Sequence, residues 1–231
     1  MRLPIATAAF AIVFLSSDSA SDPARPPAER ALPWLRDFPA DAVADEPSRG
    51  AEAQLRDRRH PDDACTTTSS ASFALTAELA PSPGPELVLA SFTAGVVVLD
   101  AAGRPLASAP PLACRGSVDA IEGVVVGELL PGEPVIALAA TAGGRMERTT
   151  WLILYAPRGE ALAPIFAAPV EEWRGPVVST GEVTKLPGGA LRYRTPDGEV
   201  SRWTYDRKAG RFVMRELLQP SPEARLAGPS V

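Results

Sequence analysis

Short runs of apolar and β-branched residues, separated by turn residues, dominate the chain from Thr66 onward. Val, Leu, Ile and Thr gather in runs of four to seven residues, and Gly, Pro or Asp-Gly stand between the runs. The clearest runs are 86–90, 95–100, 123–127, 134–138 and 150–155. Turn signals recur every 8 to 12 residues, and no stretch has a 3.6-residue period. This pattern is typical of an all-β domain.

The last two runs differ from the earlier ones. Residues 191–194 and 199–205 alternate polar and apolar side chains on either side of Pro196-Asp197-Gly198, the strongest hairpin signal in the chain. The earlier runs are apolar at successive positions, as in strands that are buried on both faces. We therefore expect the middle of the body to lie in the core and the C-terminal hairpin to lie nearer the surface.

The runs fall into three related stretches of about fifty residues. Each has a first strand near Glu78, Glu128 or Glu182, then a Pro- and Gly-containing turn and three further strands. These glutamates are 50 and 54 residues apart. The prediction is an all-β fold of three propeller-blade-like antiparallel meanders. The meanders are expected to form a partial propeller, a sandwich or one part of an oligomeric ring, unless the repeat only reflects an Ala- and Val-rich composition.

This layout resembles the FG-GAP or VCBS repeat of integrin-type β-propellers, over roughly residues 73–216. In that family a Gly-Asp pair ends the first strand, and an acidic, Gly-rich calcium loop follows. Glu78, Glu128 and Glu182 fall on the position of that Asp. The loops at 80–83, 130–133 and 184–187 each offer at most one carboxylate, whereas calcium needs about six to eight oxygen ligands. The resemblance therefore implies the strand order alone, and we expect no metal or other cofactor.

The first twenty residues have the three parts of a secretory signal peptide. Met1-Arg2 is followed by an apolar run over 3–15 and by small residues over 16–20. The run is too short for a membrane span, which needs about 20 apolar residues. A buried N-terminal helix is the alternative. The pattern predicts a cleaved signal peptide and a secreted or periplasmic protein of a bacterium.

Residues 21–64 are rich in Pro, Ala and charge, and their apolar residues have no fixed period. Such a stretch buries little surface against the entropy of ordering it, so we expect a disordered spacer. The single histidine of the chain, His60, stands in this spacer, where a solvated role is favoured over a catalytic one. The all-β repeat domain is expected over 65–218, and a flexible tail over 219–231.

Cys65 precedes the first repeat unit and Cys114 follows it. Two cysteines of an exported protein usually pair. A disulfide here would close a loop of about 50 residues and stabilise the fold by roughly 4 kcal/mol in the chain-entropy model. A catalytic thiol would need a nearby base, and the one histidine lies in the spacer. The prediction is a structural disulfide.

Charge and residue counts exclude several functions. The chain has 23 basic and 28 acidic residues, a net charge of −5, which gives no basic field for nucleic acid or anionic lipid. One histidine and two cysteines exclude a zinc finger and a multi-histidine metal site. A nucleophile elbow and a phosphate loop are absent.

Paired carboxylates are the remaining route to catalysis. Asp119 with Glu122, and Glu171 with Glu172, suggest the alternative of an envelope polysaccharide hydrolase, because a glycosidase uses two carboxyl groups around one bond. Adjacent residues of a strand point to opposite faces, which weakens the second pair. Solvated surface charge is the favoured interpretation of both pairs.

Aromatic residues point instead to a contact surface. Trp173 lies between the second and third units, and Tyr193, Trp203 and Tyr205 lie on the last hairpin among arginines. Exposed Trp, Tyr and Arg commonly anchor interfaces, but an edge hairpin with one face on the core has the same pattern, and this structural use is the favoured interpretation of the aromatic residues themselves. We therefore predict an exported, non-catalytic binding module for a protein or glycan of the cell envelope. Its oligomeric state is left open.

Overall fold

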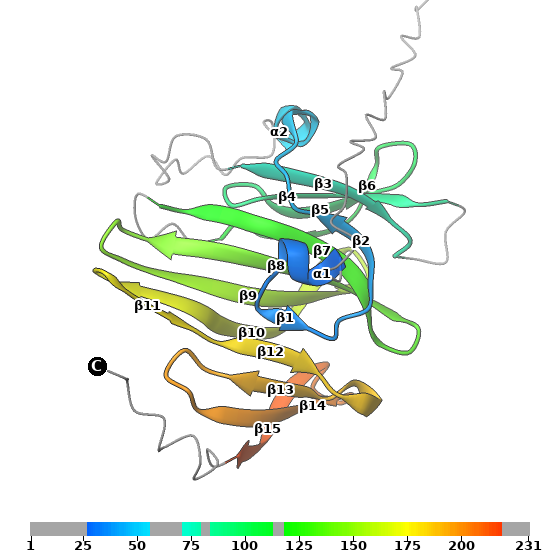
Figure 1. Cartoon of the computed structure of the whole chain (residues 1–231). Helices are drawn as coiled ribbons and strands as arrows, with labels where there is room; N and C mark the ends of the chain where they lie inside the picture. The colour runs from blue at the N-terminus through cyan, green and yellow to red at the C-terminus, as the bar shows by residue number, and fades with distance from the viewer. Residues whose placement is uncertain (1–26, 56–70, 80–83, 113–117, 219–231) are drawn as a thin grey trace, which may run out of the picture.

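The computed structural model describes residues 27–55, 71–79, 84–112 and 118–218 (Figure 1). The expected signal peptide and C-terminal tail, together with His60, Cys65 and Cys114, lie outside the described residues. Strands make up most of the described chain, which confirms the all-β prediction. Among the described residues, neither α-helix has the length and apolar character that crossing a membrane requires.

Three four-stranded antiparallel meanders form the body, as the repeat predicts. The first consists of β3 (Ser72–Ala77), β4 (Glu86–Ser91), β5 (Gly95–Leu99) and β6 (Pro105–Ala109). The second consists of β7 (Ala120–Leu130), β8 (Glu133–Gly143), β9 (Glu147–Arg158) and β10 (Ala161–Arg174), and β11 (Val177–Thr180) folds back on β10. The third consists of β12 (Glu182–Lys185), β13 (Leu191–Arg194), β14 (Val200–Asp206) and β15 (Arg211–Leu218), with a 3₁₀ turn at Pro187–Gly189.

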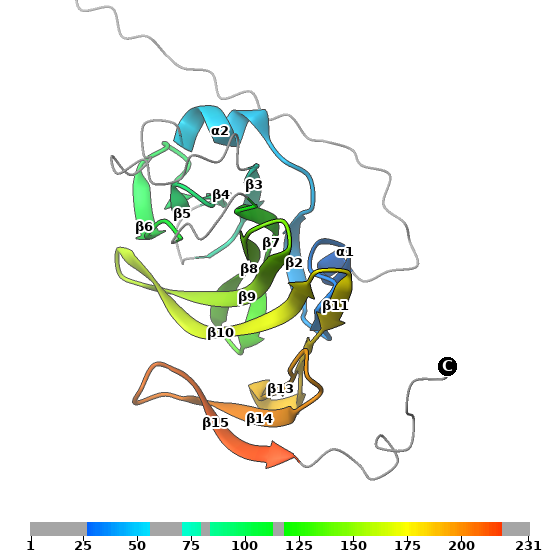
Figure 2. The same cartoon turned by 90° about the vertical axis from the view of Figure 1, so that its left-hand side faces the viewer.

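The first two meanders share one sheet. Strands β6 and β10 pair in parallel at Ser108 and Ala161, which joins the meanders edge to edge. The strand order is β2-β7-β8-β9-β10-β6-β5-β4-β3, and the sheet curls until β2 and β3 lie close together (Figures 1 and 2). Beside these strands, the Ser48 N–H donates to the Ser72 carbonyl at 2.7 Å. The result is a nearly closed barrel, so these two units are not separate sheets.

Strands of the barrel are apolar on both faces because both faces are covered. In β8, Ile136 and Leu138 point into the barrel, whereas Ala137 and Ala139 point outward. The inward residues join side chains of β3, β4 and β5 in one interior cluster. The outward ones pack beneath the third meander and the N-terminal segment. This two-sided burial explains the uninterrupted apolar runs of the sequence.

The third meander forms a second sheet, of order β1-β12-β13-β14-β15, against the outside of the barrel (Figure 1). Its central hairpin turns at Pro196-Asp197-Gly198, where Gly198 has a φ of 90° and donates to the Thr195 carbonyl at 2.9 Å. In this hairpin of β13 and β14, β14 is half-buried or exposed along most of its length, whereas Leu191 and Tyr193 of β13 are buried in the core. The expected surface position therefore holds for β14 but not for these two residues of β13.

The N-terminal segment connects the two sheets. It contains α1 (Pro27–Ala31), β1 (Leu35–Arg36), β2 (Ala40–Ala44) and α2 (Arg49–Leu55). Strand β1 pairs with β12 in the second sheet, whereas β2 pairs with β7 in the barrel. Leu32 and Leu35 are fully buried in the core between the two sheets, and α2 covers β4 and β5.

The prediction of a disordered spacer over 21–64 is therefore wrong for residues 27–55. The elements here are only two to seven residues long, too short to show a period in the sequence. A few apolar side chains anchor them, and ion pairs add contacts: Arg36 lies 2.7 Å from Glu29 of α1 and 3.5 Å from Glu182 of β12.

Candidate functional site

Three of the four aromatic residues predicted to bind a partner lie together between the barrel and the second sheet. Phe166, on the outer face of β10, is their centre. Its ring meets Trp203 edge to face at 5.4 Å and Tyr193 at 6.1 Å between centroids. Tyr205 lies 5.5 Å from Phe212, which also contacts Phe166. Such edge-to-face pairs stabilise a core beyond the area that they bury.

The polar atoms of these rings are bonded within the protein. The Tyr193 hydroxyl donates to the Pro169 carbonyl at 2.6 Å, and Trp203 Nε1 donates to the Ser201 hydroxyl at 2.9 Å. Arg158, at the end of β9, donates to the Tyr205 hydroxyl. Burial, with the charges of Glu172 and Asp197, raises the pKa of Tyr193 to about 12. The three rings thus join the second sheet to the barrel.

A concave surface opens where these rings approach solvent. It lies between β10 and the edge strand β15, and its volume is about 510 Å³. We call it the β10–β15 groove, defined by its lining residues Pro164, Ile165, Phe166, Ala167, Trp203, Arg211, Phe212, Val213 and Met214. Trp203 is the one residue of the sequence-predicted set in this lining. Arg211 is its only charged residue, and Met214 is 55% exposed.

Sequence reasoning missed most of this groove. Phe166 lies in an apolar stretch that predicts a core strand, and nothing in its sequence neighbourhood indicates contact with β15. Met214 carries no signal of its own, because it continues the apolar run of Phe212 and Val213 in the last strand. These residues come together only because the second sheet packs on the outer face of the barrel.

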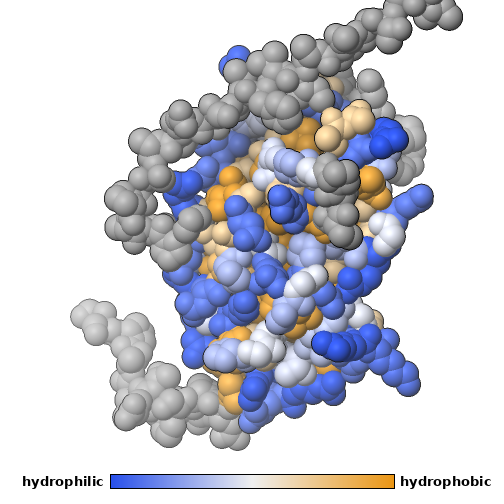
Figure 3. Space-filling view, turned by 90° about the vertical axis from the view of Figure 1, so that its right-hand side faces the viewer, coloured by the Kyte–Doolittle hydropathy of each residue, from blue (hydrophilic) through white to orange (hydrophobic). Residues whose placement is uncertain are grey.

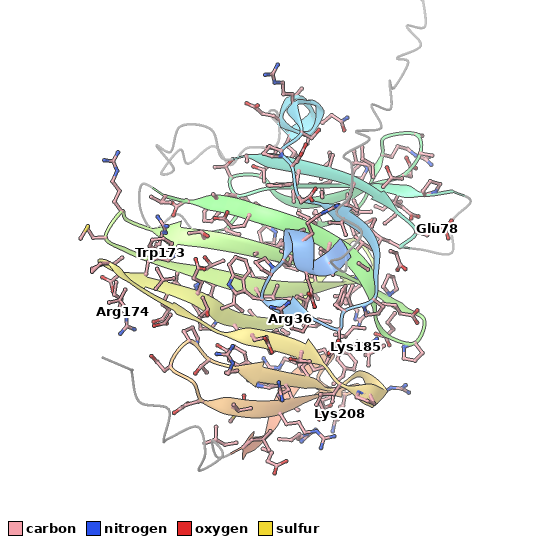
Figure 4. The ribbon with its side chains drawn as sticks, in the orientation of Figure 1. Arg36, Glu78, Trp173, Arg174, Lys185 and Lys208 are labelled. Carbon is pink, nitrogen blue, oxygen red and sulfur yellow. The ribbon has the colours of Figure 1, made fainter. Side chains whose placement is uncertain are left out.

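Trp173 lies at a different place, near the end of β10 (Figure 4). It sits between two cross-strand neighbours, Arg148 of β9 and Val178 of β11. The Arg148 guanidinium lies over the indole at 3.8 Å from the ring centroid, and the indole Nε1 donates to Glu171 at 2.6 Å. Met146, in the neighbouring β8–β9 turn, is 70% exposed. Figure 4 shows Trp173 and Arg174 at the opposite end of the molecule from Lys208 of the β14–β15 turn.

The candidate carboxylates hydrogen-bond to groups of the protein itself. Asp119 accepts from the Gly143 N–H at 3.1 Å, and Glu122 accepts from the Thr141 hydroxyl at 2.7 Å. Glu171 accepts from Trp173, as described above. The structure does not bring Glu171 and Glu172 together, because they are adjacent in β10 and their side chains point to opposite faces.

Glu172 and two of the three glutamates at the repeat positions, Glu128 and Glu182, also contact neighbouring groups. Glu172 pairs with Arg174 at 2.7 Å. Glu128 accepts a hydrogen bond from the Gly132 N–H and so stabilises the turn between β7 and β8. Glu182 pairs with Arg36. Within the described ranges, no group of three or more His, Cys, Asp or Glu residues is placed to hold a metal ion.

Comparison of the chain with protein families, curated proteins and solved structures gives no match. The resemblance to FG-GAP repeats therefore stays a prediction. The geometry alone defines the candidate site, which is an apolar groove at the junction of the two sheets.

Proposed function

We propose that this chain is a non-catalytic protein-binding module and that the β10–β15 groove receives apolar side chains of a partner polypeptide. The observation that carries the proposal is the groove itself, a hollow of about 510 Å³ lined by apolar residues and the Trp203 ring. Ligand pockets typically have volumes of about 300–1,000 Å³ and apolar walls with a few polar groups. Tryptophan at such a position is a frequent anchor of protein interfaces.

The lining favours a protein over a glycan. A sugar carries a hydroxyl on most of its carbons, and each hydroxyl that leaves water needs a hydrogen-bonding partner. Arg211 is the one charged side chain of the lining, and the indole Nε1 of Trp203 is already bonded to Ser201. Apolar side chains of a protein need no such partners.

Charge narrows the class of partner further. Residues 182–218 contain eight Lys and Arg residues and five Asp and Glu residues, a formal charge of +3 in a chain whose net charge is −5. In Figure 3 the lower part of the visible face, which belongs to the second sheet, is largely hydrophilic. A net positive charge on the residues of the second sheet, which supplies one side of the groove, fits an acidic polypeptide with apolar anchors. The signal-peptide pattern of residues 1–20 supports a secreted or periplasmic location for this partner.

Site-specific photo-crosslinking tests the proposal. A photoreactive amino acid replaces Met214 in the full chain, and the control carries it at Lys208 in the β14–β15 turn. After irradiation in an extract of the cell envelope, we expect one dominant protein adduct from position 214 and none from position 208.

Competition identifies the surface that binds. Unlabelled wild-type chain should suppress the adduct, and so should a Leu217→Arg variant, which is altered on β15 outside the lining. A Met214→Arg variant should not suppress it. Adducts with glycan alone, or equal competition by both variants, would refute the groove as a protein site. Hydrolysis of cell-wall glycan by the chain that is lost in a Glu122→Gln or Glu171→Gln variant would refute the non-catalytic assignment.

A further inference from the structure

Strand β11 leaves an edge of the barrel sheet open. Among the described strands it pairs only with β10, and its four residues carry no charge. Val177 is 59% exposed and Val178 is 42% exposed. An open, uncharged edge with β-branched residues is a template for pairing with another strand. Val177 and Val178 are therefore exposed on a strand that has a neighbouring strand on one side only, among the residues that the structure describes.

The other edges of the described sheets are protected. Strands β2 and β3 approach each other as the barrel curls. Strand β1 has two residues, and short edge strands pair poorly. Strand β15 carries the charges of Arg211, Arg215 and Glu216 and faces a β-bulge between Arg202 and Trp203 of β14. These are devices by which natural edges avoid pairing. Strand β11 is short as well, with four residues, but it carries no charge and its pairing with β10 has no β-bulge.

We propose that β11 pairs antiparallel with β11 of a second copy of this chain, across a two-fold axis at Val178. An axis perpendicular to the sheet keeps equivalent faces on the same side, as an isologous contact requires. Because Trp173 and Val178 are cross-strand neighbours, the axis places the two Val178 side chains opposite each other between the two Trp173 rings. The resulting row is apolar and self-complementary. This surface is separate from the β10–β15 groove, so the inference does not rest on the proposed function.

The neighbours of β11 select this register. An axis at Val177 would place Pro176 opposite Val178, and proline has no N–H to donate to a ladder. An axis at Ser179 would place Thr180 opposite Val178, but the Thr180 carbonyl already accepts a hydrogen bond from Arg194 at 3.1 Å. An axis at Val178 uses residues 177–179 alone. It therefore avoids both obstacles.

Charges on the other face agree with the same register. Arg174 is the cross-strand neighbour of Val177, and Glu172 is the neighbour of Ser179. The two-fold axis places Val177 opposite Ser179 of the second copy. Each row that contains Arg174 in one copy therefore contains Glu172 in the other. Opposite charges share a row, and no like charges face each other directly.

Association should be weak, because three residues per copy form a short ladder and a small interface. The experiment is sedimentation equilibrium of the full chain at increasing concentration. We expect the apparent mass to rise from that of the monomer toward twice that value. A Val178→Lys variant places two like charges at the axis, so its dissociation constant should increase at least about tenfold. The matched control, Leu217→Lys on β15, should associate as the wild type does.

Cysteine placement tests the register. Directly opposite residues of an antiparallel pair have Cβ atoms about 4.5–5.5 Å apart, so a Val178→Cys variant should form a disulfide-linked dimer under mild oxidation. A Val177→Cys variant, whose equivalent residues lie on a longer diagonal, should form far less.

Several results would overturn the proposal. These are a wild-type chain that stays monomeric at its highest soluble concentration, equal weakening by the Val178 and Leu217 variants, and efficient crosslinking from position 177 alone. A monomer whose β11 pairs with a strand of a different protein would also overturn it. Equal unfolding midpoints of the Val178→Lys variant and the wild type would show that the substitution does not act by unfolding the chain.

Discussion

Replacing Leu35 with alanine should greatly destabilise the protein, although the sequence places this residue in a stretch whose apolar residues have no fixed period. The Leu35 side chain is 0% exposed and lies in the core shared by the two sheets. It belongs to β1, which pairs with Val183 and Thr184 of β12. The substitution therefore tests whether residues 27–55 are part of the cooperative fold.

The expected magnitude follows from the burial. Leucine-to-alanine substitution removes three carbon atoms, and each buried methylene contributes about 0.8 kcal/mol, which gives a transfer contribution of about 2.4 kcal/mol. The cavity that remains adds to this cost, so measured Leu-to-Ala substitutions in cores reach about 2.7–5.0 kcal/mol. We therefore expect the free energy of unfolding to fall by about 3 kcal/mol.

Urea unfolding of the full chain, followed by tryptophan fluorescence, measures this change. The midpoint should fall with an unchanged slope. A Leu217→Ala variant is the control, because Leu217 is exposed and its loss should cost less than about 0.5 kcal/mol. A Leu35→Ala variant that lost no more than this control would refute the inclusion of the N-terminal segment in the fold.

Three further predictions concern the interior. Burial raises the pKa of the Tyr155 hydroxyl to about 12 from an ordinary value of 10.0. As the pH rises, Tyr155 therefore loses its proton in the unfolded chain before it does so in the folded chain. The folded state should accordingly lose stability between about pH 10 and pH 12. A Tyr155→Phe variant should lose less stability over that interval, by up to about 1.4 kcal/mol per pH unit in urea titrations, and an identical loss would contradict the assignment. A Gly127→Ala variant should unfold at lower urea concentration than the wild type, because a Cβ at this position would collide with the Pro39 carbonyl. The Gly132→Ala variant is the comparison: its Cβ meets open space, so only the positive φ of 73° disfavours it, and it should cost about 1 kcal/mol. A Phe166→Ala variant should lose about 3–5 kcal/mol by calorimetry; a loss below about 1 kcal/mol would show that the ring does not join the sheets.

Local sequence patterns were sufficient to predict the strands and their grouping into meanders. Runs such as Val96-Val97-Val98 have no polar face, because the barrel interior takes Val96 and Val98 while the outer cluster under α2 takes Val97. The hairpin at Pro196-Asp197-Gly198 was predictable from its turn residues alone. Both features can be recognised from residues that are adjacent in the sequence.

Contacts between distant parts of the chain were not predictable. Parallel pairing of β6 with β10, at Ser108 and Ala161, joins two meanders into one sheet, and no local pattern encodes it. The N-terminal segment was misassigned for the same reason, since its stability comes from distant strands rather than from its own periodicity. The sequence marks Trp203 as an aromatic residue of the last hairpin, but its position beside Phe166 depends on the packing of one sheet on another.

The closure of the barrel determines where this molecule has surface left for partners. When a sheet closes into a barrel, its edge strands pair and no longer present free backbone groups. In the described residues two longer edge strands still have one side without a partner strand, β11 and β15. All the large hydrophobic side chains that are exposed in the described residues lie at or beside these edges: Met146, Val177 and Val178 near β11, and Met214 and Leu217 on β15. Exposed apolar residues scattered over a surface need no explanation, but their confinement to two strand edges does.

The β15 edge is charged and adjoins a groove, which suits side-chain recognition of another protein. The β11 edge is uncharged and self-complementary, which suits pairing with a second copy. Since the two edges lie on different sheets, one molecule has room for both contacts at once.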